Sequence, residues 1–340
     1  MPGKMRAIVL EGPRRAVLRE VAEPRRAPGE VLVSVQRAAI CGSDLAIFKG
    51  TRSAEYPLVM GHEAVGYIAD PGESEHAHGS LVVIEPNIPC GRCEVCRRGH
   101  GNVCPNKHSL GMNWPGTFAD LVAVPSEFAH PVPPQVNVED AVGVEPLAVA
   151  LHAVRAGNAG EGNRVAVVGC GAQGLLLVQV LVAFGARVVA ADLDADRLRL
   201  AQQLGAEAGV HISSDAPGDL DTRLSVPVVF EAAGTASALD LALRAATPAG
   251  RVVALGLGTA PVALLPLDFV RRGLTLNGSL IYDHPTDFQQ AIQFVAEQRI
   301  KPSQLVSQVV DGLTALPSVL GSLASNDVGG KTVVRIEERE

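Results

Sequence analysis

The chain has 340 residues, a formal net charge of −7 and an apolar content of 47%. This length predicts two domains or one large domain with insertions, and the composition supplies a sizeable core. The negative charge argues against nucleic acid or an anionic membrane as a main partner. The chain shows neither the apolar run of about 18 residues of a membrane span nor a secretory signal. We therefore expect a globular cytoplasmic protein.

The first 150 residues predict a barrel-like β domain. Short apolar runs alternate with turns rich in Gly and Pro, a pattern typical of small barrels. The polar stretch 70–79 predicts a loop, in which we expect His76 and His78 to be solvated rather than bound to a metal. The expected strands are 7–10, 31–37, 65–68, 81–84 and 121–124.

A short segment combines three types of metal ligand. It begins with Cys41-Gly42-Ser43-Asp44 and ends with Gly61-His62-Glu63. A thiolate, an imidazole and a carboxylate are zinc ligands, and three protein ligands leave a fourth position open, as in catalytic sites. By itself the pattern is only moderately specific, because a cysteine in apolar surroundings is ordinarily a small buried hydrophobe.

Four cysteines lie close together within residues 88–106. Four thiolates at this spacing can surround one tetrahedral zinc ion. An iron–sulfur cluster and disulfides are the alternatives, but the last gap is longer than in the bacterial ferredoxin pattern, and a chain without an export signal favours reduced thiols. Because four thiolates leave no open position, we expect a structural zinc site. The ligands are Cys90, Cys93, Cys96 and Cys104.

Residues 138–152 predict a helix that carries a carboxylate in apolar surroundings. Glu145 precedes Pro146 and lies between Val144 and Leu147 in sequence. Such a carboxylate needs a partner, either a metal ion or a hydrogen-bond network. A capping role ahead of Pro146 is the alternative.

A dinucleotide-binding pattern begins after Arg164. A buried strand at 165–168 leads into Gly169-Cys170-Gly171-Ala172-Gln173-Gly174, then a helix to residue 183 and a strand at 187–191 that ends at Asp192. Strand, GxGxxG, helix, strand and acid together form the pattern in full. The glycines let the backbone approach a pyrophosphate at the helix N-terminus. Because Asp192 is placed to hold the ribose hydroxyls and to repel a 2′-phosphate, we expect NAD rather than NADP.

Helices and strands continue to alternate beyond Asp192. Arg197 is the nearest downstream cation, a cofactor contact or, as the alternative, a helix-surface residue. Gly256 follows a strand at the carboxyl edge of the predicted sheet, where ligands lie in open α/β folds, so we expect it near the nicotinamide. The expected elements are helices at 196–204, up to 246 and at 288–298, and strands at 226–230, 251–255, 274–281 and 331–336.

These motifs together resemble the zinc-containing medium-chain dehydrogenases of the alcohol dehydrogenase superfamily, in particular the polyol (sorbitol) and L-threonine dehydrogenase branch. The resemblance covers nearly the whole chain. It implies an α/β protein with a GroES-like β-barrel catalytic domain, residues 1–150 and 286–340, and a Rossmann domain with a doubly wound parallel sheet, residues 151–285. The motifs are Cys41-Gly-Ser-Asp, Gly61-His62-Glu63-Ala64-Val65-Gly66, the four-cysteine loop, Glu145-Pro146-Leu147-Ala148-Val149-Ala150-Leu151 and the glycine turn.

The resemblance also implies site residues and two zinc ions per chain, one catalytic and one structural. Cys41 and His62 correspond to direct ligands of the catalytic zinc, and Glu63 and Glu145 to positions that share the third place. The zinc acts as a Lewis acid on the substrate hydroxyl, and hydride passes to the nicotinamide. Ser43 is placed to hydrogen-bond the substrate oxygen and start a proton relay.

Two departures bear on the substrate. Position 46 is Ala, where many relatives carry a His that passes the proton outward. Ile281 lies where sorbitol dehydrogenases present an Arg to the polyol. A cyclitol, an amino alcohol or a less hydroxylated alcohol therefore becomes an alternative to sorbitol.

We expect an NAD-dependent oxidoreductase of secondary alcohols or polyols that forms a homodimer or homotetramer. The alternatives are an L-threonine 3-dehydrogenase-like activity and a catalytically idle NAD-binding protein of the same fold. The complete set Cys41, His62, Glu63 and Glu145 argues against the idle protein and against a zinc-free reductase.

Overall fold

The computed structural model describes residues 3–212, 222–325 and 329–336. The chain divides into two compact units. The first comprises Met1–Glu145 with Asp283–Glu340, and the second is Pro146–Tyr282. These boundaries lie a few residues before those drawn from the sequence.

The first unit is built from mainly antiparallel β-sheets around an apolar core. Along β3 (Glu30–Ile40), Val31, Val33 and Val35 are buried, in the period-two alternation of a strand with one face on a core. A three-stranded sheet has the order β2 (Ala16–Ala22), β1 (Lys4–Leu10), β4 (Leu58–Val59). A seven-stranded sheet has the order β10 (Ala129–Pro131), β6 (Leu81–Ile84), β5 (Glu63–Asp70), β3, β18 (Lys331–Arg335), β17 (Val306–Asp311), with β9 (Leu121–Pro125) also paired to β3.

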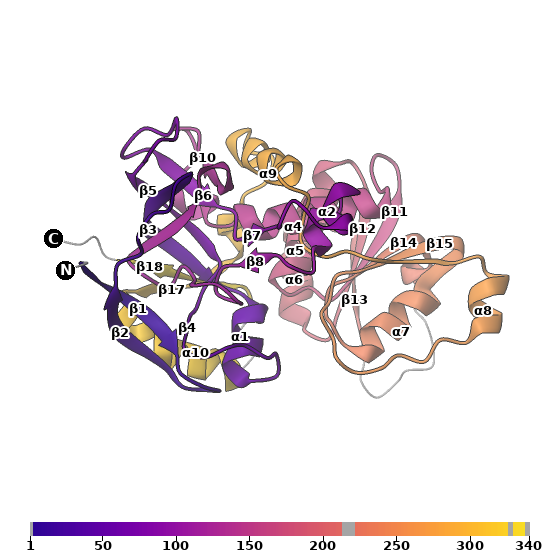
Figure 1. Ribbon diagram of the computed structural model, residues 1–340. Helices are drawn as coiled ribbons and strands as arrows, with labels where there is room; N and C mark the ends of the chain where they lie inside the picture. Colours follow the sequence, from indigo (N-terminus) through magenta and orange to yellow (C-terminus); the bar gives the residue numbers. More distant parts are fainter. Residues whose placement is uncertain (1–2, 213–221, 326–328, 337–340) are drawn as a thin grey trace. The chain divides into compact units, whose positions relative to one another are not determined.

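The C-terminal segment completes this unit. Strand β18 pairs antiparallel with β3, with Thr332 opposite Ile40, and parallel with β17. Helix α10 (Leu316–Ser325) packs against α1 (Gly42–Lys49) and β2. Figure 1 shows these yellow elements beside the indigo N-terminal strands. The same segment contains α9 (Thr286–Ala296) and 3₁₀ turns at Pro302–Leu305 and Leu313–Ala315.

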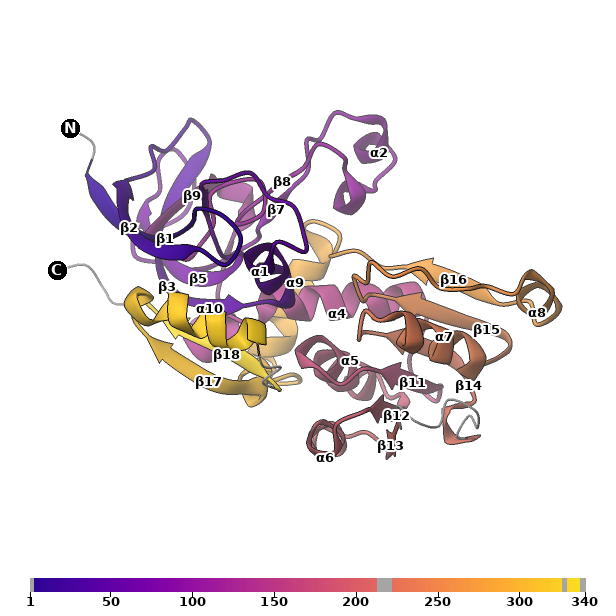
Figure 2. The same cartoon turned by 90° about the horizontal axis from the view of Figure 1, so that it is seen from below.

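The four cysteines lie on a loop that leaves a two-stranded hairpin of β7 (Asn87–Ile88) and β8 (His108–Ser109). The loop holds α2 (Glu94–Arg97) and a 3₁₀ turn, Gly101–Val103. Figure 2 shows α2 at the far end of this loop. A further 3₁₀ turn, Ser126–Phe128, precedes β10.

The second unit is a six-stranded, fully parallel sheet in the order β13-β12-β11-β14-β15-β16. Apolar runs such as 165–168 are buried throughout, because helices cover both faces of such sheets. Helices α5 and α6 contact β12, and α7 contacts β14 and β15. The elements are β11 (Arg164–Val168), α5 (Ala172–Ala183), β12 (Arg187–Asp192), α6 (Ala195–Gln203), β13 (Ala208–His211), a 3₁₀ turn (Thr222–Leu224), β14 (Val226–Glu231), α7 (Ala236–Ala245), β15 (Ala246–Ala254), α8 (Pro266–Arg271) and β16 (Thr275–Gly278).

Two expected elements differ in extent. The helix expected at 138–152 is two helices, α3 (Val138–Ala141) and α4 (Val144–Gly157). At the break a side chain on Gly143 would meet Pro302, with the Cβ atoms 2.3 Å apart. The strand expected at 274–281 ends at Gly278, and Ile281 has a positive φ of 47° that a strand does not allow.

Candidate active site

The structure brings Cys41, His62 and Glu63 together. Cys41 follows β3, Glu63 opens β5, and these strands pair with Ala39 opposite Glu63. The thiol, an imidazole nitrogen and a carboxylate oxygen of the three residues all lie within 4.8 Å of one another. His62 and Glu63 are buried, and Cys41 is half-buried. The ligand types expected from the sequence therefore converge on one position in the first unit.

Glycine at position 61 is required by this arrangement. Gly61 has φ of 92°, in the left-handed region, and a Cβ on it would lie 2.4 Å from the Phe118 ring. Any other residue would strain the backbone and displace that ring. Gly61 thus fixes the approach of the chain to His62.

Asp44 orients two of the three side chains. Its buried carboxylate lies 3.0 Å from His62 Nδ1 and accepts the backbone N–H of Cys41 at 2.9 Å. A carboxylate on one imidazole nitrogen leaves Nε2 for a metal and holds the ring in place. Burial lowers the pKa of His62, but the charge and hydrogen bond of Asp44, together with those of Cys41, raise the pKa well above its usual value.

A buried ion pair holds the third side chain. Lys331 Nζ lies 2.5 Å from Glu63 Oε1. Burial lowers the pKa of Lys331, but the charges of Glu63, Cys41 and Glu145 raise it by more than burial lowers it. The pKa of Lys331 therefore lies above its usual value. The second oxygen, Glu63 Oε2, is buried and has no hydrogen-bond partner among the described residues. An unpartnered anionic oxygen beside a thiol and an imidazole fits a zinc ion.

Three further residues named from the sequence, Glu145, Ser43 and Ala46, belong to the same unit but not to the three-residue cluster. Glu145 is buried near the start of α4 and lies outside the three-residue cluster, although its charge acts on Lys331. Ser43 and Ala46 lie on α1, directly after Cys41.

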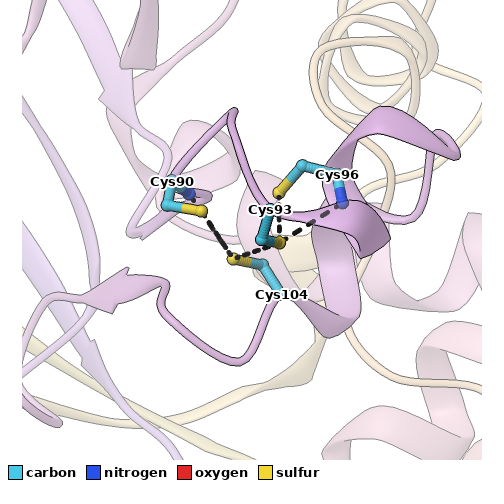
Figure 3. A group of neighbouring side chains, drawn as sticks. All are labelled: Cys90, Cys93, Cys96 and Cys104. Carbon is cyan, nitrogen blue, oxygen red and sulfur yellow. Dashed lines mark hydrogen bonds between the residues drawn. The ribbon is translucent and has the colours of Figure 1, made fainter.

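The four loop cysteines form a second cluster. Figure 3 shows their sulfur atoms turned toward one another. The Sγ atoms lie 3.4 Å apart for Cys93 and Cys96, 3.8 Å for Cys93 and Cys104, and 3.5 Å for Cys104 and Cys90. Backbone N–H groups of Arg92 and Cys93 lower the pKa of Cys90 to about 6. The donor set fits a tetrahedral four-thiolate zinc site.

The glycine turn has the shape of a phosphate site. Gly169 has φ of 93°, and a Cβ on Gly174 would lie 1.8 Å from Gly169 O, so strand and helix pack closely. A Cβ on Gly171, the N-cap of α5, would meet nothing within 4 Å. This open space before a helix N-terminus fits a pyrophosphate group. Ala172 starts the helix, and Gln173 donates to Pro146 O at 3.1 Å.

The carboxylate after β12 is fixed by backbone donors. Asp192 accepts N–H groups from Cys170 at 2.6 Å and from Asp194 at 2.9 Å. It therefore lies beside the glycine turn with its direction set. Arg197, on α6, lies 3.8 Å from the Asp194 carboxylate. Gly256 follows β15, and a Cβ on it would lie 2.7 Å from the Glu231 carboxylate.

Comparison with known proteins agrees with a two-domain nucleotide-dependent dehydrogenase. The profile of the alcohol dehydrogenase GroES-like domain matches residues 27–134, and that of zinc-binding dehydrogenases matches residues 172–297. Sorbitol dehydrogenase of Bacillus subtilis (strain 168) is 30% identical over 90% of each chain. L-threonine 3-dehydrogenase of Bacillus velezensis (strain DSM 23117 / BGSC 10A6 / LMG 26770 / FZB42) is 35% identical over 82% of this chain and 84% of its own.

Solved structures give the same result. A zinc-binding dehydrogenase of Sinorhizobium meliloti 1021 bound to NADP has a TM-score of 0.90 and 31% identity, over 98% of this chain and 99% of its own. The rspB alcohol dehydrogenase of Escherichia coli CFT073 with NADH has a TM-score of 0.91 and 29% identity over the same shares. The chain belongs to the zinc-containing medium-chain dehydrogenases, in the polyol dehydrogenase branch. The predicted fold class is confirmed.

Sequence reasoning did not assign a role to Asp44 or Lys331. Asp44 was visible as the last residue of the Cys41 motif, and its spacing of three residues suits a helix-capping carboxylate. Lys331 gave no local signal, because its partner Glu63 lies 268 residues away.

Proposed function

We propose that the protein is an NAD-dependent and zinc-dependent dehydrogenase that oxidises a secondary alcohol or polyol. The observation that supports this most strongly is the convergence of Cys41, His62 and Glu63 around one position, with the buried Glu63 Oε2 left unpartnered among the described residues. A zinc ion bound there supplies a Lewis acid that lowers the pKa of the substrate hydroxyl.

The protein's own residues position the donors and move the proton. Cys41 and His62 supply two zinc ligands, and Glu63 or Glu145 supplies the third. Asp44 holds His62, and Lys331 holds Glu63. Ser43, in the first turn of α1, accepts the proton of the substrate hydroxyl and passes it on. Ala46 has no titratable side chain, so the proton leaves from Ser43 by a path without a histidine at position 46.

The glycine turn and Asp192 support NAD as the hydride acceptor. Gly169, Gly171 and Gly174 with the start of α5 hold the pyrophosphate, and Asp192 binds the ribose hydroxyls. Relatives carry either NADP or NADH, so the choice depends on the residues at the ribose. A buried carboxylate at that position repels a 2′-phosphate. Arg197 and Gly256 complete the proposed cofactor contacts.

The substrate is a polyol, a cyclitol or a smaller secondary alcohol. Similarity to sorbitol dehydrogenase supports a polyol, whereas Ile281 replaces the Arg expected for sorbitol itself. An L-threonine 3-dehydrogenase-like activity is the second candidate, supported by the 35% sequence identity to that enzyme of Bacillus velezensis.

The four loop cysteines hold the structural zinc.

We also propose that the protein forms a homodimer or homotetramer and that the subunits contact one another at the β16 edge of the parallel sheet. Strand β16 lies at one edge of the sheet, and large apolar side chains are exposed on it and near it in sequence. Such a patch is typical of a protein interface. The exposed side chains are Leu264, Leu265, Leu267, Val270 and Leu276.

No helix among the described residues has the length and apolarity needed to cross a membrane.

The function is tested by following NAD reduction across a panel of polyols, cyclitols, secondary alcohols and L-threonine, with and without a zinc chelator. Chelator-sensitive reduction on one class supports the proposal and identifies the substrate class. Reduction that persists after the zinc is removed contradicts it. A protein that binds neither a catalytic zinc ion nor NAD supports the idle alternative.

A further inference from the structure

A third group of metal-type ligands lies in the first unit, apart from both clusters described above. It comprises Glu85, which follows β6, His130 in β10 and His284, at the start of the C-terminal segment. Their ligand atoms all lie within 4.8 Å of one another. None of these residues belongs to the proposed active site or to the cysteine loop.

Both imidazoles turn toward the same carboxylate oxygen. His130 Nε2 and His284 Nδ1 each lie 2.7 Å from Glu85 Oε2. The other oxygen, Glu85 Oε1, is buried and has no hydrogen-bond partner among the described residues. A buried carboxylate that serves only as a hydrogen-bond acceptor is expected to use both oxygens, because an unpaired buried oxygen costs free energy. Glu85 Oε1 is therefore an oxygen that remains available to bind a metal ion, next to two imidazoles.

Aromatic rings hold the two imidazoles in place. Phe128 stacks on His284, with ring centroids 4.3 Å apart, and Phe288 stacks on His130 at 4.8 Å. Glu85 is fully buried and His130 nearly so, whereas the His284 side chain is 26% exposed. Such a shell fixes ring orientation and leaves one side open to an entering ion.

We propose that Glu85, His130 and His284 form a binding site for a divalent transition-metal ion, with zinc as the best match to two imidazoles and one carboxylate. This ligand set is one that proteins use for zinc. Zinc–ligand distances of about 2.0–2.1 Å place neighbouring tetrahedral ligands about 3.3 Å apart. The two imidazole nitrogens, each 2.7 Å from Glu85 Oε2, therefore move away from that oxygen by about 0.6 Å when the ion enters, and the ion replaces the protons that they share with it.

The site is structural in character. Glu85 and His130 are 45 residues apart in the chain, and His284 is 199 residues from Glu85. An ion held by all three links the C-terminal segment of the first unit to β6 and β10. A link that closes long loops restricts the unfolded chain, so occupancy stabilises the fold.

The test is metal analysis combined with cobalt spectroscopy on the full-length protein. After a brief wash with a weak chelator, the zinc-loaded protein is titrated with Co²⁺ at about pH 8. Mild alkali is needed because a proton competes for His284: burial lowers its pKa, but the hydrogen bond and charge of Glu85 raise it more. Cobalt at this site produces d–d absorption without thiolate charge transfer, whereas cobalt at Cys41 or in the cysteine loop shows both.

The expected result is about three metal equivalents per chain in the parent and about two in Glu85→Gln and His284→Gln, which also lose the sulfur-free cobalt band. His76→Gln is the matched control, because its imidazole lies within hydrogen-bond distance of the Ser126 carbonyl and outside every ligand group found among the described residues. Equal metal content and an unchanged cobalt spectrum in parent and variants would overturn the proposal. If both variants fail to fold, the parent alone decides, since a titration without a sulfur-free band excludes the site.

Discussion

Lys331 and Glu63 form an ion pair across the end of β3, immediately beside Cys41. In the sheet, β3 lies between β5 and β18, with Ala39 opposite Glu63 and Ile40 opposite Thr332. The pair is enclosed, because the Glu63 side chain is fully buried and that of Lys331 is 13% exposed. The lysine therefore neutralises one oxygen of a proposed zinc ligand and leaves the other free.

Replacing Lys331 by Met is expected to destabilise the protein by about 3–5 kcal/mol, because it leaves a buried carboxylate without its cation. Lys331→Arg keeps the charge and should lose much less. Urea denaturation of both variants measures the difference. A Met variant as stable as the parent would show that Glu63 does not depend on this pair.

Cys41→Ala is expected to abolish turnover while NAD binding stays within about twofold of the parent. The thiol is one of three converging donors, whereas the glycine turn lies elsewhere in the chain. Steady-state kinetics and NAD titration by fluorescence separate the two effects. Retained turnover would refute the catalytic zinc.

Asp44→Asn should weaken zinc binding at the proposed active site by about 10–100-fold, because the amide no longer supplies a charged partner for His62 Nδ1. Competition with a chromogenic chelator gives the affinity. Because the cysteine loop is untouched, its zinc should remain tightly held. An unchanged affinity would mean that His62 does not bind the metal through its other nitrogen.

Cys96→Ala is expected to lower stability before it affects chemistry, since the loop loses one of four thiolates and with it the structural zinc. Cys170→Ala is the matched control. Burial and the charge of Asp192 raise the pKa of the Cys170 thiol to about 12, and no other cysteine is grouped with it among the described residues. Thermal unfolding and zinc content are compared. Equal stability and zinc content in the two variants would rule out a structural zinc.

Asp192→Ala should raise the Kd for NAD and reduce discrimination against NADP, because the carboxylate that repels a 2′-phosphate is lost. The ratio of kcat/KM for the two cofactors measures this preference. The backbone N–H of Cys170 also loses its acceptor, so the fold is checked by circular dichroism. A preference equal to that of the parent would place the ribose contact elsewhere.

Most of the fold could be predicted from local patterns in the sequence. Period-two alternation and continuous apolar runs identify most strands, and the glycine turn identifies its unit because strand, turn and helix are consecutive. Elements without such a local pattern escaped. Strand β17 and helix α10 were not predicted; along β17 only Val310 is buried, so its sequence shows no regular apolar alternation.

The same limit applies to the site. The Cys41 and Gly61-His62-Glu63 motifs are local, whereas Lys331 and the group of Glu85, His130 and His284 are assembled from segments 45 to 268 residues apart. Apart from His62, the only histidines considered as metal ligands from the sequence were the neighbouring His76 and His78, which were expected to be solvated. In the structure His76 instead contacts the Ser126 carbonyl at 3.0 Å.

The pairing of β18 with β3 also sets an order for folding during synthesis. The second unit, Pro146–Tyr282, is one continuous stretch and can form as soon as it leaves the ribosome. The first unit begins earlier but lacks β17 until residue 311 has emerged, and β18 with Lys331 until residue 335 has emerged. Until then the edge of β3 is unpaired and Glu63 has no cation, so the nascent chain exposes a strand edge that invites aggregation or chaperone binding. The first unit is thus begun before the second and completed after it.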